Sequence, residues 1–231
     1  MRADGVMNSD IIRISARQFG DSSGVEDWRV LDNGAYAFFR TRSFAEAARL
    51  ITAISDLADV GEQGPDVDVR SAGVTVRLIT ITDDYFGMSQ GDVELARQIS
   101  ALARAQGAPA DPSALQSLLI IPGAPVTADV MPFWRAVLGY EPRGDSPDED
   151  LVDPHRRGPA FWFEEMREPR PDGGGAIHVA IWVPYEQAEA RVAAALAAGG
   201  RMVRDEFAPA WWTLADAAGN EADIATIMHR D

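Results

Sequence analysis

The chain of 231 residues contains no cysteine and only three histidines. Without cysteine there is no disulfide, no thiolate nucleophile and no thiolate metal site, so any metal would need nitrogen and oxygen ligands. The chain also lacks an uninterrupted apolar window of about 18 residues, and its start, MRADGVMNSD, has no apolar segment of signal-peptide length. We therefore expect a cytoplasmic protein without a membrane span.

Positive charge is scarce as well. The chain has 36 acidic and 21 basic residues, which gives a formal net charge of −15. Such an excess repels phosphate backbones and anionic membrane surfaces, so we expect neither nucleic acid nor membrane as a partner. Hydrophobic residues make up 46% of the chain, enough for packed cores, and the length predicts one or two domains.

The first half of the chain predicts two strand pairs, each followed by a helix. Asn33-Gly34 joins the first pair, because Asn-Gly favours the positive φ angles of a tight hairpin. Ser43 and Ser89, each with an acidic residue three positions later, are typical helix caps. Ile11–Phe19 fits either the end of a strand or the start of a helix. The predicted elements are strands Trp28–Leu31 and Ala35–Thr41, a helix from Ser43 to about Asp59, strands Val67–Arg70 and Gly73–Thr82, and a helix after Ser89.

Short motifs in this half resemble the pterin-4a-carbinolamine dehydratase family, also called 4a-hydroxytetrahydrobiopterin dehydratases. The matching positions are Pro65-Asp66, Thr82, Asp84, Gly87-Met88-Ser89 and Asp92. The family's histidines are replaced: Gln63 and Gly64 stand in place of a histidine pair, and Asp83 stands in place of the third. The resemblance implies an α+β fold in which a four-stranded antiparallel sheet carries both helices on one face.

The dehydratase reaction removes a 4a-hydroxyl from a pterin, which requires one group to protonate the leaving oxygen and one to accept the N5 proton. Histidine suits both steps near neutral pH, and losing such a group typically costs ~10²–10⁴ in rate. Asp83 and Asp84 are therefore candidate catalytic residues, and Gln63 and Asp66 candidate substrate ligands. The alternative is that Asp66 and Asp84 cap turns while Asp83 is solvated.

The segment from Gly107 to Ser113 contains a helix-ending glycine and two prolines, which predict a domain boundary. We expect domains at 1–107 and 115–231, joined by a linker at 108–114. The second half predicts two βαβββ units in tandem, a repeat of about fifty residues. The expected elements are strands Gln116–Ile121, Glu149–Val152, Pro159–Glu165, Ala176–Val183, Arg201–Glu206, Trp211–Ala215 and Asn220–Ile227, and helices Thr127–Leu138 and Tyr185–Ala198.

This repeat resembles the glyoxalase-like and bleomycin-resistance branch of the vicinal-oxygen-chelate (VOC) superfamily. The resemblance is carried by Phe133–Tyr140, Ile177–Val179, Ala197–Gly200, Trp212–Asp216 and Gly219–Glu221. Members that use a metal place ligands on the first and last strands of each unit. Carried over by position, the resemblance implies a possible divalent metal held by Gln116, Glu164 or Glu165, His178 and Asp223. The alternative is a metal-free cleft in which His178 only lines the wall.

Aromatic residues in this half are candidates for binding a planar ligand. Trp182 shares a strand face with His178 and could line the cleft, whereas adjacent Trp211 and Trp212 must point to opposite faces. Ordinary core packing is the alternative. The acidic run Gly144–Arg157 indicates a solvated hairpin loop, and we expect His155 there to be exposed and without a role.

We interpret the chain as a two-domain α+β protein, dehydratase-like and then glyoxalase-like, that acts on or binds a small organic molecule such as a pterin or another heterocycle. Three functions stay open: a hydro-lyase that uses the carboxylates, a resistance-type protein that sequesters a small molecule, and a metal-dependent VOC lyase or isomerase. Both families commonly form pairs, so we expect a homodimer.

Overall fold

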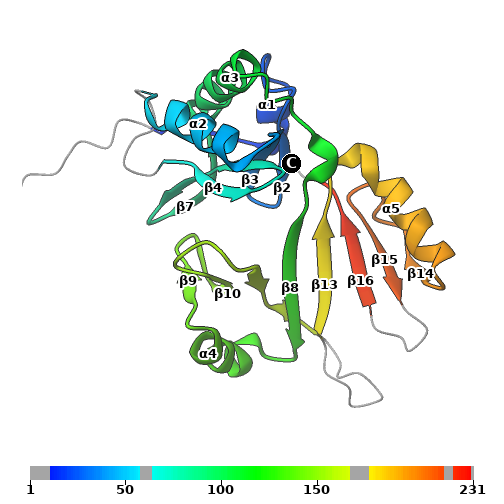
Figure 1. Cartoon of the computed structure of the whole chain (residues 1–231). Helices are drawn as coiled ribbons and strands as arrows, with labels where there is room; N and C mark the ends of the chain where they lie inside the picture. Colours follow the sequence, from blue (N-terminus) through cyan, green and yellow to red (C-terminus); the bar gives the residue numbers. More distant parts are fainter. Residues whose placement is uncertain (1–10, 58–63, 167–176, 216–220, 230–231) are drawn as a thin grey trace, which may run out of the picture.

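The computed structural model describes residues 11–57, 64–166, 177–215 and 221–229. These residues form two sheet systems with their own helices, one above the other in Figure 1. The structure is thus of the predicted α+β class. Gln63, the candidate ligand in the front half, lies outside the described residues. In the described part of the chain no helix is long and apolar enough to cross a bilayer.

The front domain is built on a four-stranded antiparallel sheet in the order β2-β3-β5-β4. Helices α2 and α3 cover one face, where Ala37, Phe39 and Val76 are completely buried. Side chains alternate between the two faces of a strand, so Tyr36, Phe38 and Arg77 lie on the other face. The elements are β2 (Arg29–Leu31), β3 (Gly34–Arg40), α2 (Phe44–Ser55), β4 (Asp66–Arg70), β5 (Gly73–Leu78) and α3 (Gln90–Ala105).

The prediction of one strand from Gly73 to Thr82 is wrong. β5 ends at Leu78, and β6 (Thr80–Thr82) pairs instead with β7 (Tyr85–Ser89). The Thr80 hydroxyl lies 2.7 Å from the Asp92 carboxylate, which ties this second hairpin to the start of α3. Ile11–Phe19, which fitted either a strand or a helix, contains one after the other. Strand β1 (Arg13–Ile14) pairs with β7, and most of helix α1 (Ala16–Gly20) follows it.

The rear domain consists of two βαβββ units whose strands form one curved sheet in the order β14-β15-β16-β13-β8-β11-β10-β9. The first strands of the units, β8 and β13, are antiparallel neighbours at its centre, with His178 opposite Ile121. The elements are β8 (Ser117–Ala124), α4 (Thr127–Leu138), β9 (Glu141–Arg143), β10 (Ser146–Val152), β11 (Ala160–Trp162), β12 (Glu164–Glu165), β13 (Ile177–Trp182), α5 (Tyr185–Ala197), β14 (Arg201–Arg204), β15 (Trp211–Ala215) and β16 (Glu221–Ala225).

Most of the run Gly144–Arg157 is exposed, as expected, but its strand begins earlier than the predicted Glu149. Strand β10 begins at Ser146 within it, and Asp150 is only 5% exposed. The guanidinium of Arg143, on β9, lies 3.3 Å from the Asp150 carboxylate and compensates part of its buried charge. His155 is exposed, as expected.

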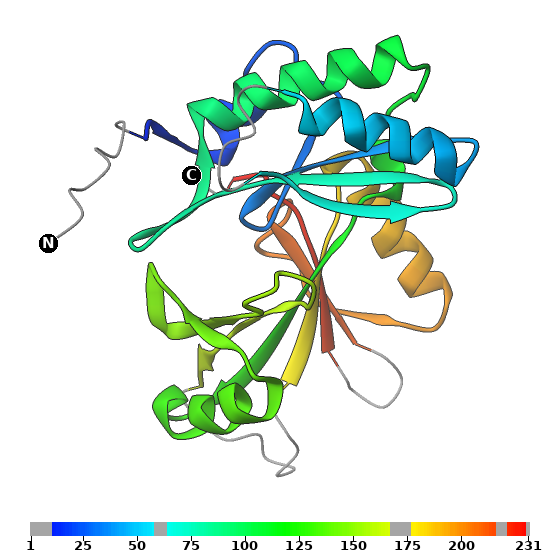
Figure 2. The ribbon, with the colours of Figure 1, turned by 60° about the vertical axis from the view of Figure 1, so that its left-hand side comes forward.

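The two domains meet through the open face of the front sheet. Leu31, Tyr36 and Phe38 from this face join a hydrophobic cluster with Trp182 and Ala225 of the rear sheet. The predicted linker also contacts the front sheet, because the Asp111 amide donates to the Phe38 carbonyl. Figure 2 shows the front sheet lying across one end of the rear strands. The open face of the front sheet is therefore turned toward the rear domain.

Candidate functional site

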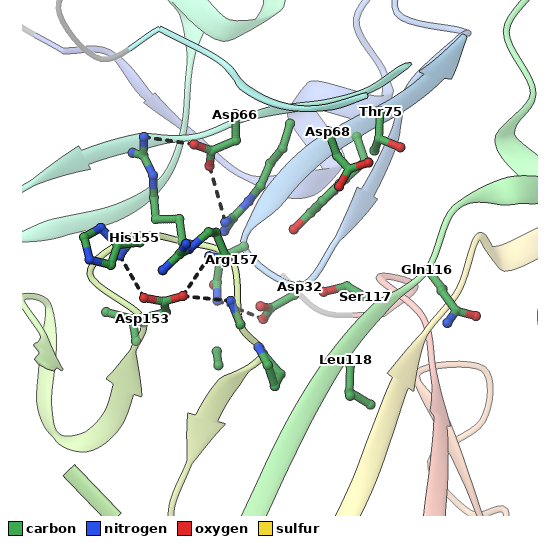
Figure 3. A pocket seen from close by; sticks show the side chains of 18 of the residues that line it. Asp32, Asp66, Asp68, Thr75, Gln116, Ser117, Leu118, Asp153, His155 and Arg157 are labelled. Carbon is green, nitrogen blue, oxygen red and sulfur yellow. Dashed lines mark hydrogen bonds and ion pairs between the residues drawn. The ribbon is translucent and has the colours of Figure 1, made fainter. Parts of the chain in front are cut away.

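A cavity of about 620 Å³ lies between the two domains. Its upper wall in Figure 3 is the open face of the front sheet, with Asp66 and Thr75. Arg77 lines the cavity from the same sheet face. The opposite wall is formed by the start of β8, around Ser117, and by the loop 153–159 that joins β10 to β11. Both domains are therefore needed to enclose it, and its size is typical of a small-molecule site.

Asp66 lies between two arginines from different domains. Its Oδ1 is 2.9 Å from the Arg156 guanidinium of the rear domain, and its Oδ2 is 3.7 Å from Arg77 Nη1 of the front domain (Figure 3). Burial raises the pKa of the Asp66 carboxyl, and the charges of the two arginines oppose that rise. The pocket thus contains a carboxylate whose charge is only partly compensated.

Asp66 and Arg77 each have one polar side-chain atom without a hydrogen-bond partner within the described residues. These atoms are Asp66 Oδ2, an acceptor, and Arg77 Nε, a donor. Both are buried. A polar atom that loses water without gaining a partner costs about 1–3 kcal/mol. Both atoms are closed off from solvent, so this cost is part of the folded structure, and the cavity presents the rest of the Asp66 carboxylate and of the Arg77 guanidinium.

Aromatic rings and guanidinium groups supply flat surfaces beside Asp66. The Arg77 guanidinium lies 5.5 Å from the ring centre of Tyr36 and 5.9 Å from that of Phe86. Arg143 approaches the same Phe86 ring at 5.4 Å. Desolvation raises the pKa of Asp32 nearby, against the attraction of Arg77 and Arg143. This wall suits a planar organic molecule, because both ring faces and guanidinium planes stack on flat ligands.

The candidate catalytic residues of the front half do not line this cavity. Asp83 and Asp84 form the exposed turn between β6 and β7. Asp84 accepts hydrogen bonds from Arg13 at 2.7 Å and from Thr82 at 2.8 Å. The bond from Arg13 is the main reason that the pKa of Asp84 is lowered. A carboxylate held in its ionised form is a poor proton donor, so the geometry favours Asp66 over Asp84.

The candidate metal ligands of the rear domain do not converge. His178 Nε2 lies 3.4 Å from Asp223 Oδ2, and this interaction, more than any other, raises the pKa of His178. Glu164 shares their sheet face by strand alternation. Gln116 instead lines the interdomain cavity. It is five residues along the chain from Ile121, the partner of His178, roughly 16 Å away.

No group of three or more His, Asp or Glu side chains in the described residues is arranged to hold a metal ion. The candidate aromatic ligands are also divided. Trp182 is buried in the cluster between the domains, on the sheet face that carries His178. Trp212 packs on the opposite face, in the core under α5. Neither tryptophan lines the interdomain cavity.

The arginines of the cavity were missed by the sequence analysis. Arg77 alternates with apolar residues in a strand, Arg143 lies in a strand that was not predicted, and Arg156 and Arg157 follow His155 in a loop that we interpreted as solvated. A signal was available: His155-Arg156-Arg157 is a basic run within an acidic stretch of an acidic chain.

Comparisons with known proteins support the two-domain interpretation. The family described as pterin 4 alpha carbinolamine dehydratase matches residues 13–102, and the family described as glyoxalase-like domain matches residues 120–225. A protein of Chloroflexus aurantiacus named "Putative pterin-4-alpha-carbinolamine dehydratase" is 32% identical over 76 residues, which cover 33% of this chain and 80% of that protein. A protein of the same name from Roseiflexus sp. is 32% identical over 85 residues, 37% of this chain and 86% of that protein.

Two solved structures overlap with about half of the chain. A structure described as an NAD-dependent benzaldehyde dehydrogenase from Legionella pneumophila aligns with 47% of this chain and 97% of its own, at 15% identity and a TM-score of 0.35. A glyoxalase/bleomycin resistance protein/dioxygenase superfamily member from Vibrio splendidus aligns with 48% of this chain and 99% of its own, at 16% identity and a TM-score of 0.32.

The fold and the matched regions define a fusion of a dehydratase-like domain with a glyoxalase-like domain, which confirms both resemblances. Through its front domain the chain belongs to the pterin-4a-carbinolamine dehydratase family.

Proposed function

We propose that this protein binds a flat heterocycle of the pterin class in the cavity between its domains. Membership of the dehydratase family supports the class of ligand. The observation that carries the proposal is the cavity between the domains, whose wall places Asp66 and Arg77 beside the rings of Tyr36 and Phe86. Asp66 is also the residue that matches the family's acidic position after proline.

The chemistry of a pterin complements this pair. Its pyrimidinone ring presents an N–H donor directly beside a carbonyl acceptor. In the proposed complex the N–H donates to the Asp66 carboxylate, and the carbonyl accepts from the Arg77 guanidinium. The ring plane then lies in reach of Tyr36 and Phe86, which already contact the guanidinium groups of the cavity.

Binding is tested by titrating the protein with biopterin and following the pterin's fluorescence. Asp66→Asn replaces one acceptor with an amide and should weaken binding about tenfold or more, since a hydrogen bond to a charged group contributes about 1.5–3 kcal/mol. Asp83→Asn, in the exposed turn outside the cavity, is the matched control and should bind like the parent. Equal affinity of all three proteins would overturn the proposed role of Asp66.

A hydro-lyase reaction is a second candidate function, because one imidazole does line the cavity. In the described part of the chain, His155 is the only histidine on its wall, and it comes from the rear domain. As an imidazolium it would protonate the leaving 4a-hydroxyl, and the proton then lost from N5 would return to the neutral ring, so that water is released without net change in the enzyme.

The test is dehydration of a 4a-carbinolamine by the parent protein, His155→Gln and Asp83→Asn. For a reaction in the interdomain cavity, we expect His155→Gln to lower the catalysed rate by a factor of ~10²–10⁴ and Asp83→Asn to leave it unchanged. Loss of activity in Asp83→Asn alone would instead indicate that the turn between β6 and β7 contains the catalytic residue. Absence of catalysis in the parent protein, together with biopterin binding, would leave a binding protein.

A further inference from the structure

We infer that the ligand of the interdomain cavity carries an acidic group, a carboxylate or a phosphate, which binds to the loop that joins β10 to β11. The inference rests on the proposed binding of a pterin-class ring at Asp66 and Arg77. It adds a specificity: the front domain holds the ring and the rear domain holds the acidic substituent.

The charge of the cavity differs from that of the chain. Its lining includes five arginines, one histidine and four aspartates, whereas the chain as a whole has 36 acidic and 21 basic residues. Basic and acidic side chains are thus nearly balanced around the cavity, and a cation left without a partner there would attract an anion.

Three of the four cavity aspartates already have partners. Asp66 faces Arg77 and Arg156. Asp68 accepts two hydrogen bonds from Arg70, at 2.7 and 2.8 Å. The carboxylate of Asp153 is occupied by backbone amides of its own loop. Arg143 is in turn paired with Asp145 and Asp150, 2.7 and 3.3 Å away, so four of the five cavity arginines have a carboxylate partner.

Arg157 is the cation that remains for a ligand. Within the described residues its guanidinium forms no ion pair and no hydrogen bond, and it lines the cavity beside His155 (Figure 3). A guanidinium presents several N–H donors in one plane, which matches the oxygens of a carboxylate or phosphate in a two-bond geometry. Arg157 therefore provides a free site for an acidic group.

The loop is built to hold Arg157 in this place. Asp153 accepts the backbone amides of His155, Arg157 and Gly158 at 2.8, 2.9 and 2.9 Å. Arg156 has a φ of 55°, a conformation that side-chain-bearing residues rarely adopt and that occurs most often at functional sites. The loop thus keeps a costly backbone conformation that turns Arg156 toward Asp66 and leaves Arg157 at the cavity.

The experiment compares two pterins that share one ring system, neutral 6-hydroxymethylpterin and anionic pterin-6-carboxylate, by fluorescence titration at pH 7.5. The parent protein should bind the carboxylate about tenfold more tightly or better. Arg157→Gln should remove most of this preference and leave the affinity for the neutral pterin unchanged. Arg135→Gln, on the exposed side of α4, is the control and should retain the preference.

The outcomes separate this inference from the proposed function. Equal affinity of the parent protein for the two pterins, or a preference that survives in Arg157→Gln, would overturn the acidic-group site while pterin binding stands. Failure of both pterins to bind would overturn the proposed function and this inference with it. The phosphate ester of 6-hydroxymethylpterin distinguishes the source of the anion: tighter binding than the carboxylate would assign the site to phosphate.

Discussion

Asp66→Asn should change stability and binding in opposite directions. Burial raises the pKa of Asp66 despite two nearby arginines, so the folded protein disfavours the charged carboxylate relative to the unfolded chain. Asparagine has the same shape without the charge. We therefore expect the unliganded variant to be more stable at neutral pH, on the order of 1 kcal/mol, while its affinity for biopterin falls.

The effect of Asp66→Asn on the free energy of unfolding should depend on pH. A carboxyl with a raised pKa in the folded state binds more protons when folded, so its penalty is absent at low pH and grows as pH rises through the raised pKa. The stability advantage of Asp66→Asn should thus shrink as pH falls from 7 toward 4. For a chain of this length, 1 kcal/mol corresponds to roughly 2–4 °C in the melting temperature.

The assay is thermal unfolding followed by circular dichroism, with urea unfolding as an independent measure of stability. Both domains contact Asp66, so the transition of each domain is assigned before the comparison. A variant that is less stable than the parent at pH 7 would refute the reasoning, because the ion pairs of Asp66 with Arg77 and Arg156 would then outweigh its desolvation. Unchanged affinity of Asp66→Asn for biopterin would refute the prediction that Asp66 binds the ligand.

Three further predictions concern other parts of the structure. The interaction with Asp223 raises the pKa of His178, so the parent protein should have a stability advantage over His178→Ala that contains a pH-dependent part. This part should be full below about pH 6.5 and disappear as pH rises through the raised pKa, in urea unfolding at several pH values. Gly158→Ala places a Cβ atom 1.9 Å from the Tyr140 hydroxyl, so it should displace the loop and weaken binding of pterin-6-carboxylate; adding Tyr140→Phe should restore part of it. Asp84→Asn, in the exposed turn, should leave melting temperature and biopterin binding unchanged.

Local patterns predicted most elements of the fold. The helix Thr127–Leu138 has the predicted bounds, because helical spacing and the following Gly139, at a φ of 67°, define its ends. The break between β5 and β6 could not be predicted. Ile79 and Ile81 continue the alternation without interruption, whereas the contact of Thr80 with Asp92, which accompanies the break, is a tertiary interaction.

The candidate site was only partly predictable for the same reason. Asp66 could be found from a local motif next to proline. Its partner Arg156 is 90 residues away in another domain, and no periodicity within one segment predicts such a pair. Trp212 illustrates the converse limit: alternation placed Trp211 and Trp212 on opposite faces, but which of them lies under α5 depends on how the sheet is covered.

The most direct test of the account is a crystal structure of the protein with biopterin. We expect the pterin ring between the domains, with its N–H at the Asp66 carboxylate and its carbonyl at the Arg77 guanidinium. A pterin bound instead on the rear sheet beside His178 and Asp223, with the interdomain cavity unchanged, would contradict the account.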